Sequence, residues 1–493
     1  MESVTSIKPL LAILTSIIVV VPILLSRKHP NVREGWSFLA GFVKLAIVGS
    51  MVPLVLKGTV IEYTMIEVVA GVALKFRVDA MGLLFALVSS TLWIVTTGYS
   101  IGYMRGLKEH SQTRYYCFFA LALSGTIGVA FAANLFTLYL FYEILSLATF
   151  PLVTHHQDAE ARASGRKYLT FILGSSIGLV LPAMLIIYNI TGTLEFSNSG
   201  ILSAGMSKGL MSVLFFMFIF GFAKAAVMPF HPWLPAAMVA PTPVSSLLHA
   251  VAVVKVGVFS IFRVVTGIFG IDNLRMFELG TALCWVAAFT ILAGSLVALS
   301  QDSLKRRLAF STIGQLSYIV LGAALLSKQG MTGGMLHILM HAFGKITLFF
   351  CAGAIFVATG HKYLSQMVGI GRRMPVTMTA FFIGSLSVIG FPPTGGFLSK
   401  WYLLLGTLEA DQPLMMFILL SSTLLNAAYF LPIAYKAFFC SDEEAQFEQK
   451  IDEAPIWCVA PLVFTATVSV GLFFFPQPFL DLAKLAVQGF TGG

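Results

Sequence analysis

The chain has 493 residues, of which 57% are hydrophobic and 11% are charged, and its formal net charge is +9. Because a typical soluble domain has about a quarter of its residues charged, this composition excludes a water-soluble fold. The basic residues fall in short stretches between apolar runs, so their positions favour a lipid bilayer as the surroundings and do not favour a nucleic acid partner.

Apolar segments of about 20 residues, long enough to cross a bilayer as a helix, recur along the whole chain. They predict an all-α, polytopic membrane protein with about 14 transmembrane helices in a single domain, residues 1–493. The predicted helices are 9–26, 36–56, 79–103, 115–133, 135–153, 168–191, 209–228, 244–268, 277–300, 308–326, 332–358, 375–391, 412–435 and 455–476, and a further helical piece at 395–408 follows a break.

Lysine and arginine are distributed unequally between alternate loops. One side of the predicted bundle carries basic clusters within 27–33, 105–114, 162–167, 305–307 and 362–373, together with Lys436 and Lys450, whereas the other side has only scattered basic residues. The positive-inside rule places the richer side in the cytoplasm. We therefore predict a cytoplasmic (inner) membrane protein with both termini on the outer face.

Proline and glycine interrupt two predicted helices, in MPFHPWLP at 228–235 and GFPPTGGF at 390–397. Unpaired backbone groups inside a bilayer are tolerated where protein or a water-filled cavity satisfies them, so paired breaks are typical of a transport route. If 115–268 and 276–440 are five-helix units, both breaks fall on the fourth helix, and the odd helix number makes the two repeats inverted. Proline that merely kinks packed helices is the alternative, which explains one break better than a matched pair.

Five ionisable residues lie inside apolar spans, namely Glu143, Lys224, Lys255, Lys345 and Lys400. A charge near the centre of a transmembrane helix costs about 2.5–3.5 kcal/mol, so these residues indicate a function, and we predict that they form a proton pathway. Opening and closing a Glu143–Lys224 pair would unload and load a proton on the lysine. A static salt bridge that holds the bundle together is the alternative for this pair.

His337, His341 and Lys345 follow one another at intervals of four residues and would therefore share one helix face. A zinc site of the HExxH kind would need an acid between the histidines, but positions 338–340 are Ile, Leu and Met. We favour a hydrated proton relay, since imidazole exchanges protons near neutral pH. Each histidine alone could equally be a buried hydrogen-bonding residue.

Three further residues are secondary candidates for the pathway: His231, His249 and Lys305. The helix that carries Lys224 is expected to break at Pro229, before His231 is reached, and His249 is expected to share the next helix with Lys255 without facing it. His155 and His156 are interpreted as loop residues whose position permits proton access from the cytoplasm. The cysteines form no CxxC pair, and the chain has no Gly-rich phosphate loop, so we predict no metal site and no cofactor.

Several of these segments resemble one known family, the antiporter-like proton-conducting subunits shared by respiratory complex I, multisubunit Na+/H+ (Mrp-type) antiporters and membrane-bound hydrogenases. The resemblance extends from about Asp79 to Lys436. The segments that carry it are FYEILSLATF at 141–150, FAKAAVMPFHPWLPAAMVAPTPVSSLLHAVAVVKVGVF at 222–259, DSLKRRLAFSTIGQLSY at 302–318, HILMHAFGKITLFF at 337–350 and GFPPTGGFLSKW at 390–401.

The resemblance implies fourteen helices with two inverted five-helix repeats, a Glu143–Lys224 pair, a central Lys255, relay histidines and a terminal residue at Lys400. Lysine at position 400, where some members carry glutamate, is similar to the D-type subunit of the cation/proton antiporters and to one of the complex I subunits. The implied partners are other membrane subunits of the same complex, including homologous antiporter-like subunits.

The main hypothesis is a proton-translocating subunit of a multisubunit cation/proton antiporter or of a redox-driven proton pump. No catalytic centre is expected in this chain, because the redox centres of an NADH:quinone oxidoreductase-type or hydrogenase-type translocase would belong to other chains. The alternative is a stand-alone secondary carrier that couples H+ or Na+ to solute movement. A purely structural scaffold would keep its transport unchanged after the buried charges are neutralised.

Overall fold

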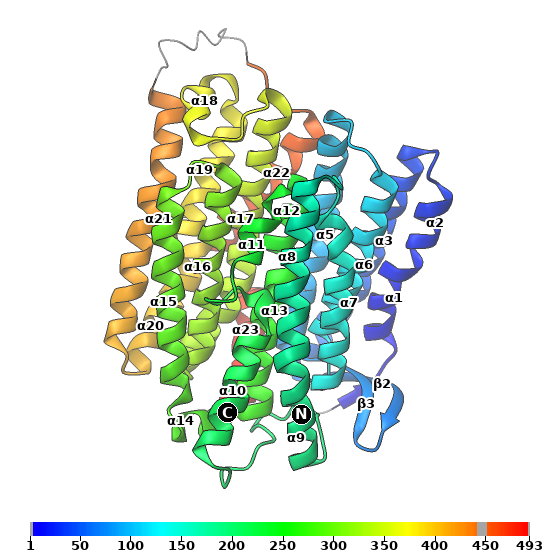
Figure 1. Ribbon diagram of the computed structural model, residues 1–493, viewed down its shortest axis with the longest axis vertical. Helices are drawn as coiled ribbons and strands as arrows, with labels where there is room; N and C mark the ends of the chain where they lie inside the picture. Colours follow the sequence, from blue (N-terminus) through cyan, green and yellow to red (C-terminus); the bar gives the residue numbers. More distant parts are fainter. Residues whose placement is uncertain (1–2, 441–450, 492–493) are drawn as a thin grey trace.

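The computed structural model describes residues 3–440 and 451–491. Its long helices run side by side along one axis and form a single bundle (Figure 1). Within the described residues, ten helices are long and apolar enough to cross a membrane. The chain is therefore a mostly helical, polytopic membrane protein, as its composition predicts.

The N-terminal helices cover one edge of the bundle (Figure 1). They are α1 (Lys8–Ile18), α2 (Val20–Leu25), α3 (Pro30–Gly49) and α4 (Val52–Leu56). The large apolar side chains that α1, α2 and α3 expose fit a lipid-facing surface.

A small three-stranded sheet departs from the all-α prediction. Strands β2 (Val60–Val69) and β3 (Val72–Val78) form an antiparallel hairpin, and β1 (Ser3–Thr5) pairs with β2 in parallel. The turn of the hairpin contains Gly71, whose φ of +74° is a backbone conformation that glycine adopts without strain. A search for apolar runs of bilayer length misses such a hairpin because its strands are short and partly polar.

The middle of the chain forms both long helices and an irregular central segment. The long helices are α5 (Ala80–Gly106), α6 (Gln112–Ala130), α7 (Leu135–Val153), α8 (Ala159–Ser175) and α9 (Leu181–Thr191), with η1 (Ser176–Val180) between the last two. The irregular segment comprises α10 (Lys208–Gly221), η2 (Ala223–Ala225), α11 (Trp233–Ala236), η3 (Ala237–Val239), α12 (Thr242–Ser246), η4 (Leu247–Val251), α13 (Val253–Val264) and η5 (Val265–Phe269). The stretch from Thr242 to Phe269 is buried along its whole length and therefore lies inside the bundle.

The second half is more regular and is organised around one long, deeply buried helix, α17. Its elements are α14 (Ile271–Met276), α15 (Leu279–Ser300), α16 (Leu304–Ala324), α17 (Lys328–Thr359), η6 (Leu364–Met367), α18 (Ile370–Arg373), α19 (Pro375–Ile389), α20 (Gly395–Glu409), α21 (Pro413–Phe439), α22 (Ile456–Phe474) and α23 (Gln477–Thr491). Helices α16, α19, α20 and α22 all pack against α17.

The two helix breaks differ in how well the sequence locates them. The second break follows the prediction, because α19 ends at Ile389 and Gly390 takes a φ of +86°. The first break comes earlier than the predicted Pro229: α10 ends at Gly221, and Ala226 has a φ of +54°. Lys224 therefore lies in the short 3-10 turn η2 within the break and not on a continuous helix.

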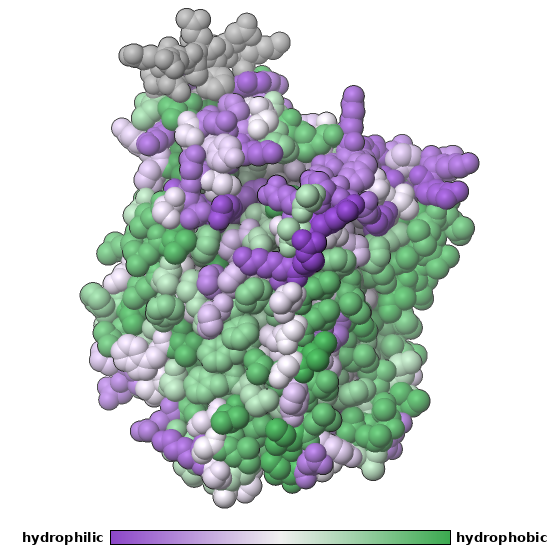
Figure 2. Space-filling view, in the orientation of Figure 1, coloured by the Kyte–Doolittle hydropathy of each residue, from purple (hydrophilic) through white to green (hydrophobic). Residues whose placement is uncertain are grey.

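The two ends of the bundle differ in polarity. Hydrophilic side chains gather at the end that carries α18, and the sides of the bundle are largely hydrophobic (Figure 2). Both chain termini lie at the opposite end (Figure 1). There Ser3 and Phe490 line the same cavity, which has a volume of about 250 Å³.

An ion pair at this second end joins the start of α5 to α13, with Arg263 buried and Asp79 22% exposed. The Arg263 guanidinium donates to both carboxylate oxygens of Asp79, at 2.5 and 2.7 Å. Asp79 also caps α5, because its carboxylate accepts a hydrogen bond from the Gly82 backbone N–H at 2.8 Å. The pair therefore satisfies a helix terminus and a buried charge at the same time.

We expect Arg263→Ala to lower the free energy of unfolding by about 1–3 kcal/mol, because it removes two charge-assisted hydrogen bonds from a carboxylate that is only partly exposed to water. Lys208→Ala is the matched control: Lys208 and Glu278 form an ion pair at 3.4 Å in which both side chains are mostly exposed. Its loss should cost about 0–1 kcal/mol. Thermal unfolding of the detergent-solubilised variants measures the difference, and equal midpoints for the two would contradict a stabilising role of the Arg263–Asp79 pair.

Candidate functional site

The four candidate lysines lie on four different elements, η2, α13, α17 and α20, and all are buried. Lys224, Lys255 and Lys345 have no exposed surface, and Lys400 retains 6% of its surface. Burying an ammonium group is costly unless acceptors replace its water, so the partners of each lysine define the site.

Lys224 is held by α7. Its Nζ donates to the Tyr142 carbonyl oxygen at 2.7 Å and to the Ser146 hydroxyl at 2.6 Å. It also lies 3.1 Å from the centroid of the Tyr142 ring. The predicted Glu143–Lys224 ion pair is not formed in this structure, and both carboxylate oxygens of Glu143 are buried without a hydrogen-bond partner among the described residues.

Lys255 and His341 form the direct link between α13 and α17. The Lys255 Nζ lies 2.7 Å from the His341 Nδ1. The other ring nitrogen of His341, Nε2, is buried and has no hydrogen-bond partner within the described part of the chain. An imidazole with one nitrogen on a lysine and the other unoccupied is suited to accept a proton on one side and release it on the other.

His337 lies one helical turn from His341 on α17. The buried series Lys224, Lys255, His341, His337, Lys345 and Lys400 is called the row. The two imidazole rings are stacked with their centroids 5.7 Å apart. The His337 Nδ1 lies 2.8 Å from the Ser399 hydroxyl on α20, and its Nε2 lies 3.0 Å from the Gln315 Oε1 on α16. The side chain therefore connects three helices through polar contacts alone.

The ammonium groups of Lys345 and Lys400 contact separate sets of polar groups. The Lys345 Nζ donates to the Ser311 hydroxyl at 2.8 Å, and the Tyr429 hydroxyl donates to the same oxygen at 3.0 Å. The Lys400 Nζ donates at 2.8 Å to the carbonyl oxygen of Ile389, the last residue of α19. The break after α19 thus leaves a carbonyl free to accept from a buried lysine.

Two of the secondary candidates line a hydrophilic cavity of about 890 Å³ near the polar end of the bundle. They are His231 and Lys305, and the Lys305 Nζ donates to the Ala240 carbonyl at 2.6 Å. His249 lies apart from this cavity wall, with its ring centroid 4.7 Å from that of Phe349. Neither of its ring nitrogens has a hydrogen-bond partner in the described ranges. His249 itself lies in the π-helical η4, and Ala252 separates this turn from α13, which carries Lys255, so the two residues do not share one regular helix as predicted.

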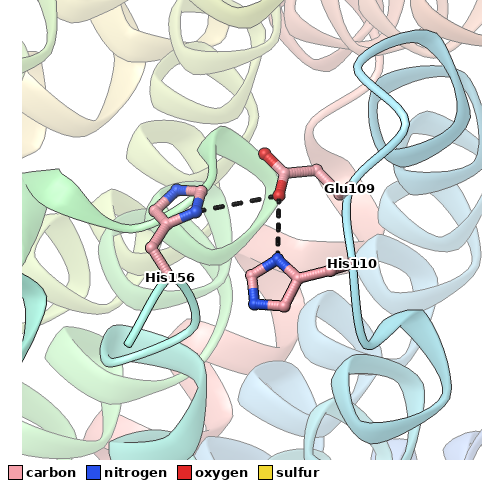
Figure 3. A group of neighbouring side chains, drawn as sticks. All are labelled: Glu109, His110 and His156. Atoms are coloured by element: carbon pink, nitrogen blue, oxygen red, sulfur yellow. Dashed lines mark ion pairs between the residues drawn. The ribbon is translucent and has the colours of Figure 1, made fainter. Parts of the chain in front are cut away.

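The rim of this cavity carries a cluster that the sequence does not bring together. Glu109 and His110 lie in the loop between α5 and α6, and His155 and His156 lie in the turn between α7 and α8. Figure 3 shows the imidazoles of His110 and His156 directed at the Glu109 carboxylate. Burial, with a further contribution from His110 and Arg114, lowers the pKa of His155 to about 3, so that this imidazole is neutral at pH 7.

Sequence reasoning missed most of the neutral partners of the lysines and of His337. These residues are Tyr142, Ser146, Ser311, Gln315, Ser399 and Tyr429. Two of them, Ser311 and Gln315, lie in the segment FSTIGQLSY, where four polar side chains within an otherwise apolar helix offered a signal. The others are single hydroxyls in apolar runs, which are common in membrane helices.

The fold and the site define a class: a polytopic helical membrane protein with two broken helices and a buried set of lysines and histidines. Residues 132–426 match the family described as NADH:quinone oxidoreductase/Mrp antiporter, TM. The chain belongs to this family, whose antiporter-like subunits occur in complex I-type, Mrp-type and hydrogenase-type assemblies. The family resemblance read from the sequence is thereby confirmed.

Relatives of the chain occur in each of these three kinds of assembly. The chain is 37% identical to NADH-quinone oxidoreductase subunit N of Desulforudis audaxviator, over 69% of this chain and 68% of that protein. It is 30% identical to a Na(+)/H(+) antiporter subunit of Alkalihalophilus pseudofirmus, over 85% of this chain and 55% of the relative. It is also 30% identical to hydrogenase-4 component B of Escherichia coli, over 80% of this chain and 62% of the relative. The chain thus spans only part of the length of these proteins.

Two solved structures share the fold over almost the whole chain. One chain of the Mrp complex from Dietzia sp. DQ12-45-1b superposes with a TM-score of 0.83, and one chain of an archaeal membrane-bound sulfane sulfur reductase superposes with a TM-score of 0.86. In both cases the similarity covers 98% of each chain at 23% sequence identity.

The hydrogen bond between Lys345 and Ser311 can be measured by a double-mutant cycle of Lys345→Met and Ser311→Ala. We expect the two changes to be non-additive by about 0.5–3 kcal/mol in the free energy of unfolding, because each single variant leaves the same buried contact incomplete. Thr347→Ala with Lys345→Met is the control pair, since Thr347 donates to Thr465 and not to the lysine. Additivity of the first pair to within about 0.5 kcal/mol would contradict the contact.

Proposed function

We propose that this chain is a proton-translocating subunit of a larger assembly in the cytoplasmic membrane, either a multisubunit cation/proton antiporter or a redox-driven pump. The observation that carries the proposal is the Lys255–His341 contact of 2.7 Å, in which two ionisable side chains meet inside the bundle with no carboxylate of the described residues paired to either. A structural role favours a lysine paired with a carboxylate. Two proton-binding groups in direct contact favour transfer.

The proposed architecture has fourteen transmembrane helices and two inverted repeats, 115–268 and 276–440. The ten long apolar helices support the count when they are combined with α6, α16 and the two broken helices, α10 with its continuation and α19 with α20. The repeats are supported by the breaks, because Lys224 lies within one break and Lys400 donates to the carbonyl that the other leaves free.

In the proposed route, protons enter the cavity lined by His231 and Lys305 and pass through Lys224, Lys255 and the histidines of α17 to Lys345 and Lys400. Several gaps lack direct hydrogen bonds, and water is the natural bridge there. Buried polar atoms without protein partners mark places where such water would bind. They include the Glu143 carboxylate, both nitrogens of His249 and the Nε2 of His341.

Each lysine in this route is held by neutral acceptors, as the Tyr142 carbonyl and the Ser146 hydroxyl show for Lys224. Neutral acceptors stabilise a charged ammonium less than a carboxylate does, so a modest change in surroundings shifts its protonation. Glu143 supplies that change if it approaches and leaves Lys224 during the cycle. The driving reaction is proposed to lie in partner subunits, which include homologous antiporter-like chains.

Lys224→Ala and Lys255→Ala should each abolish proton movement by the native assembly while the assembly still forms. The measurement is quenching of a pH-sensitive dye in membrane vesicles, with co-purification of partner subunits as the test of assembly. Lys44→Ala is the matched control: Lys44 is equally buried, but it contacts Ser16 on α1 and lies 4.6 Å from the centroid of the Trp93 ring, away from the row. Full activity of either row variant would exclude the proposed route.

The proposed orientation can be tested by labelling of single cysteines. In a chain with Cys440→Ser, we expect Lys362→Cys to react with a membrane-impermeant maleimide only in inverted vesicles, and Lys208→Cys only in intact cells. Both lysines are exposed; Lys362 lies in the loop after α17 and Lys208 is the first residue of α10, and the positive-inside rule assigns the two positions to opposite faces. Reaction of both from the same side would contradict the fourteen-helix topology, and exchanged sides would contradict the orientation.

A further inference from the structure

We propose that Glu109, His110, His155 and His156 form a binding site for a transition metal ion such as Zn²⁺ at the rim of the hydrophilic cavity. The site joins two loops that are remote in sequence, the α5–α6 loop and the α7–α8 turn. It differs from the prediction of no metal, which considered only motifs within a single helix or cysteine pairs.

The distances suit a tetrahedral ion. Glu109 Oε2 lies 3.8 Å from His110 Nδ1, 3.8 Å from His155 Nε2 and 3.7 Å from His156 Nδ1. The ligand atoms of Glu109, His110 and His156 all lie within 4.8 Å of one another. Ligands held about 2.1 Å from a tetrahedral zinc are about 3.4 Å apart, so small side-chain adjustments would close a site of Glu109, His110 and His156. His155 is outside this mutually close set and needs a larger adjustment to become the fourth ligand.

His155 adds an observation that the exposed members do not provide. Its side chain has no exposed surface, and neither ring nitrogen has a hydrogen-bond partner among the residues that the structure describes. A buried imidazole without a partner is costly, and a metal ion would satisfy it. Its Nε2 faces the same carboxylate oxygen as the other two histidines, which places it beside the proposed ion.

Neighbouring hydrogen bonds hold both loops in place before an ion arrives. The Gln112 amide donates to the Glu109 carbonyl oxygen at 3.1 Å and to the Met104 carbonyl oxygen at 3.2 Å. The Arg114 guanidinium donates to the His155 carbonyl oxygen at 2.8 Å. These contacts fix the backbone of each loop and leave the imidazole and carboxylate groups available as ligands.

The ligand chemistry selects the class of ion. Three imidazoles and one carboxylate suit Zn²⁺, Co²⁺, Ni²⁺ or Cu²⁺ and do not suit Mg²⁺ or Ca²⁺, which prefer sites made of oxygen. Glu109 and His156 also line the hydrophilic cavity. An ion bound there would occupy two titratable groups at the mouth of the route and slow proton uptake, a consequence that rests on the proposed function.

Binding is tested first, without transport. Purified full-length protein, stripped with a chelator, is titrated with Co²⁺ while the visible absorption bands of a tetrahedral cobalt site are recorded, and Zn²⁺ is then added to displace the cobalt. We expect about one Co²⁺ per chain. In H110A/H156A and in E109Q the affinity should fall by more than about 100-fold, since even outer-shell changes cost 10–100-fold.

The matched controls are H361A and E160Q, which replace a histidine and a carboxylate that line the same cavity, and both should keep the wild-type affinity. Failure of the wild-type protein to bind Co²⁺, or unchanged binding by both H110A/H156A and E109Q, would overturn the site. Melting temperatures of the metal-free proteins show that each variant is folded.

The transport arm adds Zn²⁺ to vesicles that contain the native assembly. Slower proton movement in wild type, but not in H110A/H156A, supports control of uptake by the site. If Co²⁺ binds but Zn²⁺ has no effect on transport, the metal site is supported and its regulation of proton uptake is overturned. An assembly that moves no protons at all would count against the proposed function, while the cobalt titration would still decide the metal site.

Discussion

Every polar group that lies in the hydrocarbon of a bilayer needs a partner inside the protein, and this constraint connects the main features of the structure. The buried lysines require acceptors, and ordinary transmembrane helices offer few because their carbonyls are already paired. The break after α19 supplies one, since the carbonyl of Ile389 accepts from Lys400. Lys224 itself lies in the other break and reaches a carbonyl and a hydroxyl of α7. The helix breaks therefore help to provide the hydrogen-bond acceptors that the buried lysines need.

The buried charges fall into two kinds that differ in how completely they are satisfied. Arg263 and Asp79 pair through two hydrogen bonds, and Asp79 also caps a helix. These contacts stabilise the charged form of both groups. Lys255 has a histidine in place of a carboxylate, and that histidine keeps one nitrogen without a protein partner among the described residues. Complete pairing favours a fixed structure, whereas incomplete pairing leaves room for water and for changes of protonation.

The sequence predicted those parts of the site that depend on composition and local spacing. Long apolar runs indicated the helices, charges within them indicated the lysines, and intervals of four residues placed His337 and His341 on one face. What it could not supply were contacts between remote segments, such as Lys255 with His341 on another helix. The position of the first break was predicted wrongly for the same reason. Proline is visible in a sequence, but the turn at Lys224 depends on packing against α13. There a side chain at Gly257 would collide with the backbone of Lys224 and Ala225.

At the cavity of the polar end, the same kinds of side chain could serve proton uptake and metal binding. Groups that accept protons from water near neutral pH are imidazoles and carboxylates, and these are also the ligands of borderline metal ions. A cavity mouth built from Glu109 and His156 therefore offers sites for either a proton or an ion. At an imidazole nitrogen a proton and a metal ion compete for one lone pair, so in the proposed site binding of one would exclude the other. In the proposed route, access would then depend on which ion is available, without a movement of the two loops.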